Sequence, residues 1–336
     1  MNDFATSTSS SPMPVAPKTF GQILDRTSRL MRTHFKLLVG IAAFPSILMM
    51  LAIGLMEAVI WIPMIRQFPQ QPTPQAMFHN FTSAVLILVF VAFSLLCLVI
   101  ISIYLAAASY ASTRADSGVK VTVGEAYSLA LRQKARYLWL MVLMHMYLYV
   151  PLAAVLALVG LAAALLHFVA GVGAGSWSMF FLVLTLALLY LGFLVYAILI
   201  MLRFALAFPA CVVEDLPAWA SMQRSAKLTS GAKGRIFLVI LVVYAALYAA
   251  MLAIELLAIL LGAIGAIVMM VLHAHVTAPW SYIGLGAIGI CAFAGMVLFI
   301  SLTYAALVTA LAVLYNDQRL RKDGPLATPA LAGEIA

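Results

Sequence analysis

Long apolar runs alternate with short polar segments along this chain, in a pattern that occurs three times. Each unit opens with an amphipathic stretch that carries Arg or Lys and enters an apolar run. It returns through a nearly uncharged loop and a second apolar run. The opening segments are TFGQILDRTSRLMRTHFKLL from Thr19, TVGEAYSLALRQKARYLWL from Thr122 and PAWASMQRSAKLTSGAKGRIFL from Pro217. The pattern predicts three repeated two-helix units, at residues 19–116, 117–215 and 216–324.

Each apolar run is long enough to cross a membrane as a helix, since a span needs about 20 apolar residues. Backbone groups inside lipid must find hydrogen-bond partners within their own segment, which favours helices. A membrane β-barrel would show short alternating strands instead of continuous apolar runs. We therefore predict an all-α integral membrane protein with six transmembrane helices and with kinks at Pro151 and Pro209. The predicted spans are residues 37–62, 83–112, 137–170, 178–208, 236–272 and 282–315.

The amino-acid composition excludes a soluble enzyme. Hydrophobic residues are 65% of the 336 residues and charged residues are 9%, whereas a soluble domain carries about 25% charged residues. The net charge of +8 does not indicate nucleic-acid binding, because no basic stretch is interleaved with stacking aromatic residues. Residues 1–18 and 325–336 are predicted to be disordered tails.

The distribution of Lys and Arg predicts the orientation in the membrane. Of the 19 lysines and arginines, all but Arg66 and Arg203 lie outside the spans on one predicted side. Basic residues of multi-pass proteins collect in cytoplasmic segments. We therefore expect a protein of the cell membrane with both termini in the cytoplasm.

The three amphipathic openings are predicted to form cytoplasmic elbow helices that lie in the membrane interface. In the first, Ile23, Thr27 and Leu30 share one face, as in an interfacial helix. Such helices either seat the protein against the bilayer or present a basic surface to anionic lipids or to a partner protein. The candidate binding residues are Arg26, Arg29, Arg32, Arg224, Ser225, Lys227, Arg235, Arg319 and Arg321.

Helix-start signals support these elbows. Thr19 and Thr122 are each followed three residues later by Gln or Glu, which is the spacing of a capping box. The third elbow is expected to begin from Asp215, just before a proline. Gly231 is expected to end it in a left-handed conformation.

Two segments carry a resemblance to a known family. RSAKLTSGAKGRIFLV (Arg224–Val239) resembles the R-S-W-x-L-T-x-G-x-x-x-R segment of the glycerophosphoryl diester phosphodiesterase membrane-domain family, with Ala226 in place of Trp. LYNDQRLRKDG (Leu314–Gly324) resembles its closing Y-Y-D-x-R-x-R-x-E-G, with Asn316 in place of Tyr. PACVVED (Pro209–Asp215) and the first opening segment are also similar to that family. The matching residues are Arg224, Ser225, Leu228, Thr229, Gly231, Arg235, Asp317, Arg319 and Arg321.

The resemblance covers most of residues 19–324. It implies a six-span membrane domain without the catalytic barrel found in some members, because a barrel of about 250 residues does not fit in this sequence. It therefore implies no phosphodiesterase activity.

Three ionisable residues are predicted inside spans, where charges are functional candidates. Glu57 and Glu255 take matching positions about 30 Å from the cytoplasmic edge of their helices. That depth is close to the outer interface, so they either snorkel to water or form a paired site for a cation or proton. Arg203 is expected to reach headgroups or a helix C-terminus.

No catalytic constellation is recognisable. His273 and His275 have no acidic or cysteine ligand beside them, and no serine lies in a nucleophile elbow. No phosphate-binding or dinucleotide-binding fingerprint is present. The three cysteines show no metal-like spacing. We expect neither metal nor cofactor, no nucleic-acid partner and no enzymatic activity.

Two functions fit these features. The first is a non-enzymatic membrane protein that organises lipids or partner proteins, and the alternative is a transporter or channel-like protein for a small solute or ion. A transporter would need a polar cavity near the midplane, where this sequence has few polar groups. An intramembrane enzyme is a third hypothesis. Ala245, Ala249 and Ala253 form a ridge of small residues, which predicts that span five is central to the bundle.

Overall fold

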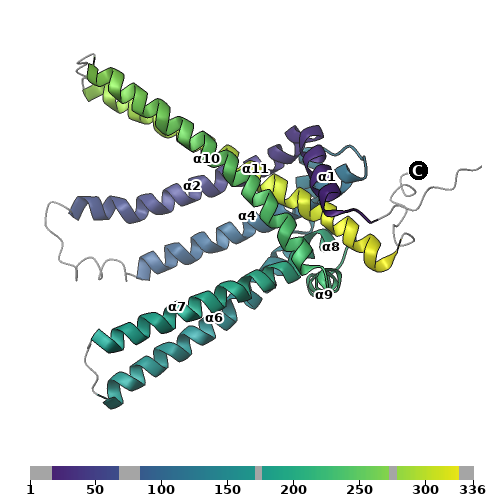
Figure 1. The fold of residues 1–336 in the computed structure, drawn as a ribbon, viewed down its shortest axis with the longest axis horizontal. Coiled ribbons are helices and arrows are strands. Elements are labelled where there is room, and N and C mark those ends of the chain that lie inside the picture. The colour runs from purple at the N-terminus through teal and green to yellow at the C-terminus, as the bar shows by residue number, and fades with distance from the viewer. Residues whose placement is uncertain (1–16, 68–83, 171–175, 272–277, 325–336) are drawn as a thin grey trace, which may run out of the picture.

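The regular structure of this chain is helical. The computed structural model describes residues 17–67, 84–170, 176–271 and 278–324, and every regular element in these ranges is an α-helix. Six of the helices are long and apolar enough to cross a membrane, as in a multi-pass membrane protein (Figure 1). They are α2 (Phe35–Gln67), α4 (Ala84–Asp116), α6 (Lys134–Ala170), α7 (Ser176–Phe204), α10 (Lys233–Val271) and α11 (Ala278–Asp323).

The six predicted apolar spans are confirmed as helices. The C-terminal ends of spans four and six differ from the prediction. Span four ends at Phe204 instead of residue 208, and a separate short helix, α8 (Ala207–Val213), follows it. Pro209 lies in the first turn of α8, where a missing N–H is tolerated, so the predicted kink is a break between two helices. The sixth helix continues past residue 315 to Asp323. Pro151 lies inside α6, which continues on both sides of it.

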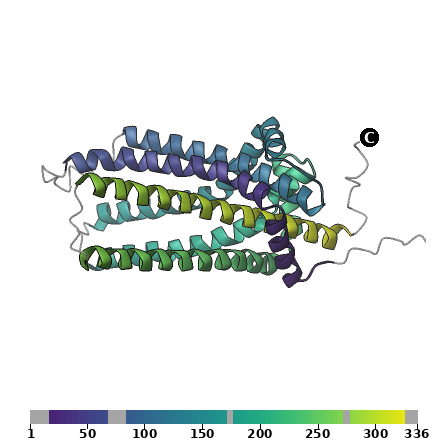
Figure 2. The same cartoon turned by 90° about the horizontal axis from the view of Figure 1, so that it is seen from above.

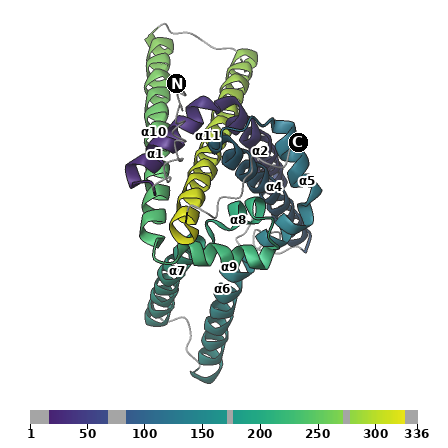
Figure 3. The same cartoon turned by 90° about the vertical axis from the view of Figure 1, so that its right-hand side faces the viewer.

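Three short amphipathic helices each precede a long one. We call α1 (Phe20–Thr33), α5 (Val123–Arg132) and α9 (Ala218–Thr229) the elbow helices, and they lead into α2, α6 and α10. All three lie with α8 at one end of the molecule, which we call the elbow end (Figure 3). From there the pairs α2–α4, α6–α7 and α10–α11 extend away and spread apart in Figure 1. The view from above shows the long helices running in one general direction (Figure 2).

The helix at the centre of the bundle is α11. More than half of its most apolar stretch is buried, whereas no residue in the corresponding stretches of α6 and α7 is buried. It packs against both α2 and α4. Small side chains make this close approach possible, and the buried ones include Ala106, Ala107 and Ala111 of α4 and Ala306 and Ala310 of α11.

The prediction that span five is central was therefore wrong. Ala245, Ala249 and Ala253 are exposed along α10. A ridge of small residues permits close packing but does not supply a partner, and in this structure α10 turns that ridge outward. Small residues that are buried against a neighbour occur instead on helices such as α4 and α11.

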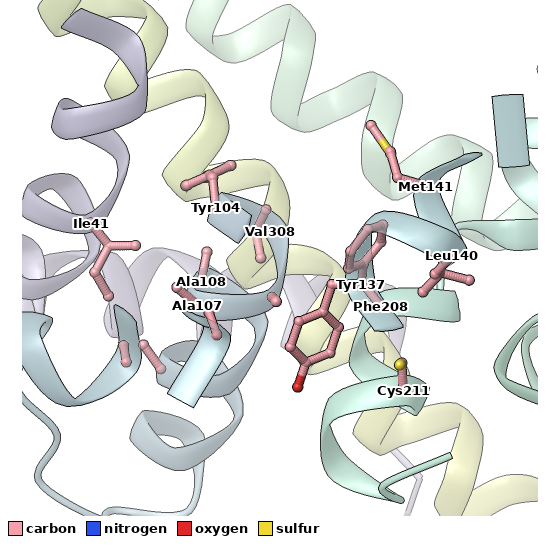
Figure 4. Close-up of a cluster of buried hydrophobic side chains, with 14 of the residues drawn as sticks. Ile41, Tyr104, Ala107, Ala108, Tyr137, Leu140, Met141, Phe208, Cys211 and Val308 are labelled. Carbon is pink, nitrogen blue, oxygen red and sulfur yellow. The ribbon is translucent and has the colours of Figure 1, made fainter. Parts of the chain in front are cut away.

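The apolar core lies toward the elbow end. Figure 4 shows Tyr104 and Ala108 of α4 beside Val308 of α11, and Tyr137 of α6 beside Phe208 of α8. A second cluster joins Ile23 and Leu30 of α1 to the elbow-end parts of α10 and α11. The apolar face of α1 is therefore covered by the protein's own helices.

The predicted helix-start and helix-stop signals can be compared with the structure directly. The Thr19 capping box is confirmed, with the side chains of Thr19 and Gln22 each accepting a backbone N–H of the other residue. The Thr122 hydroxyl caps α5 by accepting the N–H of Glu125. Gly231 follows α9 with φ of 76° and provides the expected left-handed ending.

The start of α9 differs from the prediction. Its N-cap is Pro217, which makes no side-chain capping bond. Asp215 does not cap the helix, because its carboxylate is bound by Arg136 of α6.

Candidate functional site

The elbow end holds a cluster of ion pairs that joins segments far apart in the sequence. Its deepest member is Asp317 of α11, whose side chain is fully buried. One carboxylate oxygen accepts the backbone N–H of Lys18 at 2.7 Å. The other lies 2.9 Å from Nε of Arg321 and 3.1 Å from Nη2 of Arg235. Both guanidinium groups also donate to the carbonyl of Lys18, so the chain before α1 is bound to α10 and α11.

A second group surrounds Glu214, which follows α8. Nε of Arg224 lies 3.0 Å from both of its carboxylate oxygens, and the hydroxyl of Tyr315 donates to it at 2.6 Å. Arg319 approaches the same carboxylate at 3.9 Å. Arg224 also pairs with Asp323 at the end of α11. The hydrogen bonds that Arg224 donates to Asp323, reinforced by those to Glu214, raise the pKa of Arg224 above its ordinary value, so this guanidinium stays charged.

Two further pairs complete the cluster. Asp116, at the end of α4, accepts Nε of Arg26 from α1 and Nδ2 of Asn316 from α11, both at 2.7 Å. Asp215, between α8 and α9, accepts Nη1 of Arg136 at 2.6 Å. That hydrogen bond lowers the pKa of the Asp215 carboxyl below its usual value. Asp215 has φ of 51°, a left-handed backbone conformation that Asp adopts more readily than most residues.

The motif residues of the sequence resemblance are concentrated in this cluster. Arg224, Arg235 and Asp317 are ion-pair members, as described above. The hydroxyls of Ser225 and Thr229 both donate to the carbonyl of Arg203 at the end of α7, at 2.9 and 3.2 Å. These contacts attach α9 to α7 and give the motif residues a structural role. Sequence reasoning had treated the same arginines as a binding surface.

The candidate elbow residues thus fall into two groups. Arg26, Arg224, Arg235, Arg319 and Arg321 pair with acidic residues inside the cluster. Arg29 makes only an exposed pair with Asp25 one helical turn away. Arg32 and Lys227 are exposed and have no ion pair within the described residues. The sequence pattern does not reveal that Asp116, Glu214 and Asp317 each pair with an arginine from another helix.

The intramembrane candidates lie apart from this cluster. Glu57 and Glu255 are exposed, more than twenty residues along α2 and α10 from the elbow end. Arg203 is exposed at the last turn of α7, with its guanidinium 5.7 Å from the ring centre of Phe204. Nδ1 of His145 donates to the carbonyl of Met141 at 2.8 Å within α6.

A pocket of about 460 Å³ opens beside Arg203 at the elbow end. It is lined by residues from the end of α7, the end of α9 and the start of α10. They are Arg203, Ala226, Ser230, Gly231, Lys233 and Gly234. Sequence reasoning named Arg203 but missed the other five.

Within the described residues, no group of three or more His, Cys, Asp or Glu side chains is placed to hold a metal ion. His273 and His275 lie outside the described residues, as do His79 and the loop after α6. The arrangement that the structure does show is one of paired charges, exposed cations and a small basic pocket. Such a site can bind an anion.

No protein-family model, curated protein or solved structure matches this chain. The resemblance described above therefore rests on its motifs.

Proposed function

We propose that this protein is a non-enzymatic, multi-pass protein of the cell membrane that holds anionic lipids at the elbow end and organises them, or partner proteins, there. The carrying observation is the division of its cations. One set of these cations forms ion pairs that bind the helices together. The other set is exposed with no acidic partner within the described residues, and it includes Arg32, Lys36, Lys120, Arg132, Lys134 and Lys227.

This division supports lipid binding for an electrostatic reason. Lys and Arg residues near a membrane gain about 1 kcal/mol each from an anionic leaflet, and a group of four to eight is typical of anionic-lipid binding. The exposed cations lie next to the ends of long apolar helices, on the side that the Lys and Arg distribution assigns to the cytoplasm. They are therefore positioned to meet lipid phosphates.

The proposal can be tested by identifying the lipids that co-purify with the full-length protein. Wild type should be enriched in anionic lipid relative to the membrane from which it is extracted. A triple variant, Arg32→Gln, Arg132→Gln and Lys227→Gln, should lose most of the enrichment because these side chains are exposed and hold no helix in place. Gln223→Ala, at another exposed position of α9, is the control. Wild-type protein with the lipid composition of the bulk membrane would contradict the proposal.

The proposal includes two further points. The protein belongs to the membrane-domain family named above, and it has no phosphodiesterase activity. Purified protein should not hydrolyse glycerophosphodiesters, because that chemistry needs metal-binding carboxylates and histidines gathered in one site. Metal-dependent turnover that is lost in Glu255→Gln or His273→Ala would overturn it.

A transporter is the second candidate, and one observation favours it. The hydroxyls of Tyr104 and Ser109 on α4 are buried and have no hydrogen-bond partner among the described residues, which is costly unless a ligand or water meets them. The ring of Tyr104 lies 5.6 Å from that of Tyr304 on α11. Solute uptake by reconstituted vesicles that Tyr104→Phe abolishes would favour transport over the first proposal.

A further inference from the structure

The pocket beside Arg203 combines positive charge with backbone donors. Arg203 comes from the last turn of α7 and Lys233 is the first residue of α10, and both side chains are exposed. Neither makes an ion pair within the described residues, and no carboxylate lines the pocket. This distinguishes them from the neighbouring Arg224 and Arg235, which are both bound by acids.

The start of α10 adds to this positive field. The first N–H groups of a helix have no acceptor within the helix, and its dipole places partial positive charge there. Lys233 and Gly234 lie in this first turn and both line the pocket. An anion in the pocket would therefore meet two cationic side chains and the N-terminus of a long helix.

Gly234 makes the approach to the backbone unhindered. A Cβ added at this position would meet no protein atom within 4 Å. Internal packing therefore does not explain why glycine, which is unfavourable inside a helix, occupies this position. The missing side chain leaves room on the pocket wall for a ligand.

Apolar side chains on both sides of the pocket indicate the source of the anion. Met201 of α7 and Phe237 and Leu238 of α10 are exposed. They lie within about one turn of Arg203 and Lys233 along their helices, toward the membrane. A ligand with a phosphate and acyl chains would satisfy both the basic pocket and these surfaces, whereas a free phosphate ion would leave the apolar surfaces without a partner.

We infer that the pocket formed by Arg203, Lys233 and Gly234 binds the phosphate headgroup of one anionic membrane phospholipid, whose acyl chains lie along α7 and α10. This inference rests on the proposed function and assigns it a specific site. The exposed cations of the elbow helices attract anionic lipid in general, and this pocket retains a single molecule.

The test uses full-length protein reconstituted in nanodiscs of phosphatidylcholine, or of phosphatidylcholine and phosphatidylglycerol in equal parts. After release into mild detergent, native mass spectrometry counts the lipids that remain bound. Wild type should retain one phosphatidylglycerol. Lys233→Gln and Arg203→Gln should each lower its retention about fivefold, the effect of one charge near the membrane surface. Lys322→Gln is the matched control, because Lys322 is also an exposed lysine near the end of a long helix but does not line the pocket.

Gly234→Ala separates a ligand site from a folding role. Alanine should leave the melting temperature unchanged or raise it, since helix propensity improves, and it should still reduce lipid retention. A fall in melting temperature with retention unchanged would overturn the inference. Inorganic phosphate, added in a parallel titration, should not displace the lipid; displacement would overturn the lipid as the source of the anion.

The two proposals fail differently. Wild type that shows no preference for phosphatidylglycerol would overturn the proposed function and this site together. Wild type that is enriched in phosphatidylglycerol, with Lys233→Gln and Lys322→Gln behaving alike, would overturn only the pocket.

Discussion

The guanidinium of Arg235 lies 3.1 Å from the buried carboxylate of Asp317, and this contact joins the start of α10 to the last turns of α11. Arg321 shares the same carboxylate from one helical turn away. Both arginines also bind the carbonyl that precedes α1. Three parts of the chain therefore depend on one carboxylate.

Asp317→Asn should destabilise the protein more than any other change at the elbow end. It leaves Arg235 and Arg321 without their shared counter-ion, and breaking a buried pair costs about 3 kcal/mol or more. We expect this loss in the free energy of unfolding measured by titration with a denaturing detergent. Asp25→Asn is the control, because the Asp25–Arg29 pair is exposed and such pairs contribute under about 1 kcal/mol. Equal losses in the two variants would show that Asp317 is not the centre of the cluster.

The pair between Arg136 and Asp215 should give a small, pH-dependent contribution to stability. The folded-state pKa of Asp215 is below its ordinary value of 3.8, so the stabilisation is complete above that value. It is lost as the pH falls through the folded pKa. Wild type should therefore melt slightly above Asp215→Asn at neutral pH. The two melting curves should coincide in strong acid, and a difference that persists there would rule out the ion pair as its cause.

The capping box of α1 predicts a local effect. Thr19→Ala removes a cap and should cost about 1 kcal/mol, seen as faster amide hydrogen exchange in the first turns of α1. Ser28→Ala, at an exposed position of the same helix, should leave exchange unchanged. Slower exchange in Thr19→Ala than in wild type would contradict the assigned cap.

Glu57 and Glu255 provide a test of an intramembrane site. Because both are exposed, we expect Glu57→Gln and Glu255→Gln to leave the melting temperature in detergent almost unchanged. A loss of several kcal/mol in either variant would instead indicate a buried ion site.

The orientation in the membrane is testable by labelling. In a background without the three native cysteines, single cysteines at Ser117, Ser230 and Asp323 should be protected from an impermeant reagent added outside cells. Cysteines at Gln71, Gly173 and Thr277 should react. Reversed labelling would refute the Lys and Arg argument, and a mixed pattern would refute six crossings.

The hydrophobic pattern predicts most of the fold because a long helix needs apolar side chains both where it faces lipid and where it faces the protein interior. Apolar continuity located the six long helices, and local spacing located the caps at Thr19 and Thr122, since both signals act between near neighbours. The continuation of α11 beyond residue 315 was missed because its last turns are charged. Asp317 and Asp323 in these turns pair with Arg235 of α10 and Arg224 of α9, which no local pattern reveals.

The site was less predictable for the same reason. The backbone N–H of Lys18 meets Asp317 across 299 positions of sequence, and only the assembled structure shows that contact. The sequence pattern presents Arg224 and Arg235 as an exposed basic surface, whereas Glu214, just after α8, binds Arg224 and Asp317 of α11 binds Arg235. Lys233 and Gly234 resemble ordinary helix-start residues until the end of α7 brings Arg203 beside them.

The bond between Lys18 and Asp317 also constrains the order in which the elbow end can form during synthesis. Asp317 is made 299 positions after Lys18, so the entry to α1 lacks this anchor until α11 has been made. A chain that stops early leaves Arg235 without its carboxylate. Helix α11 therefore closes the structure that α1 opens, and until it is made the guanidinium of Arg235 lacks the buried carboxylate that neutralises it.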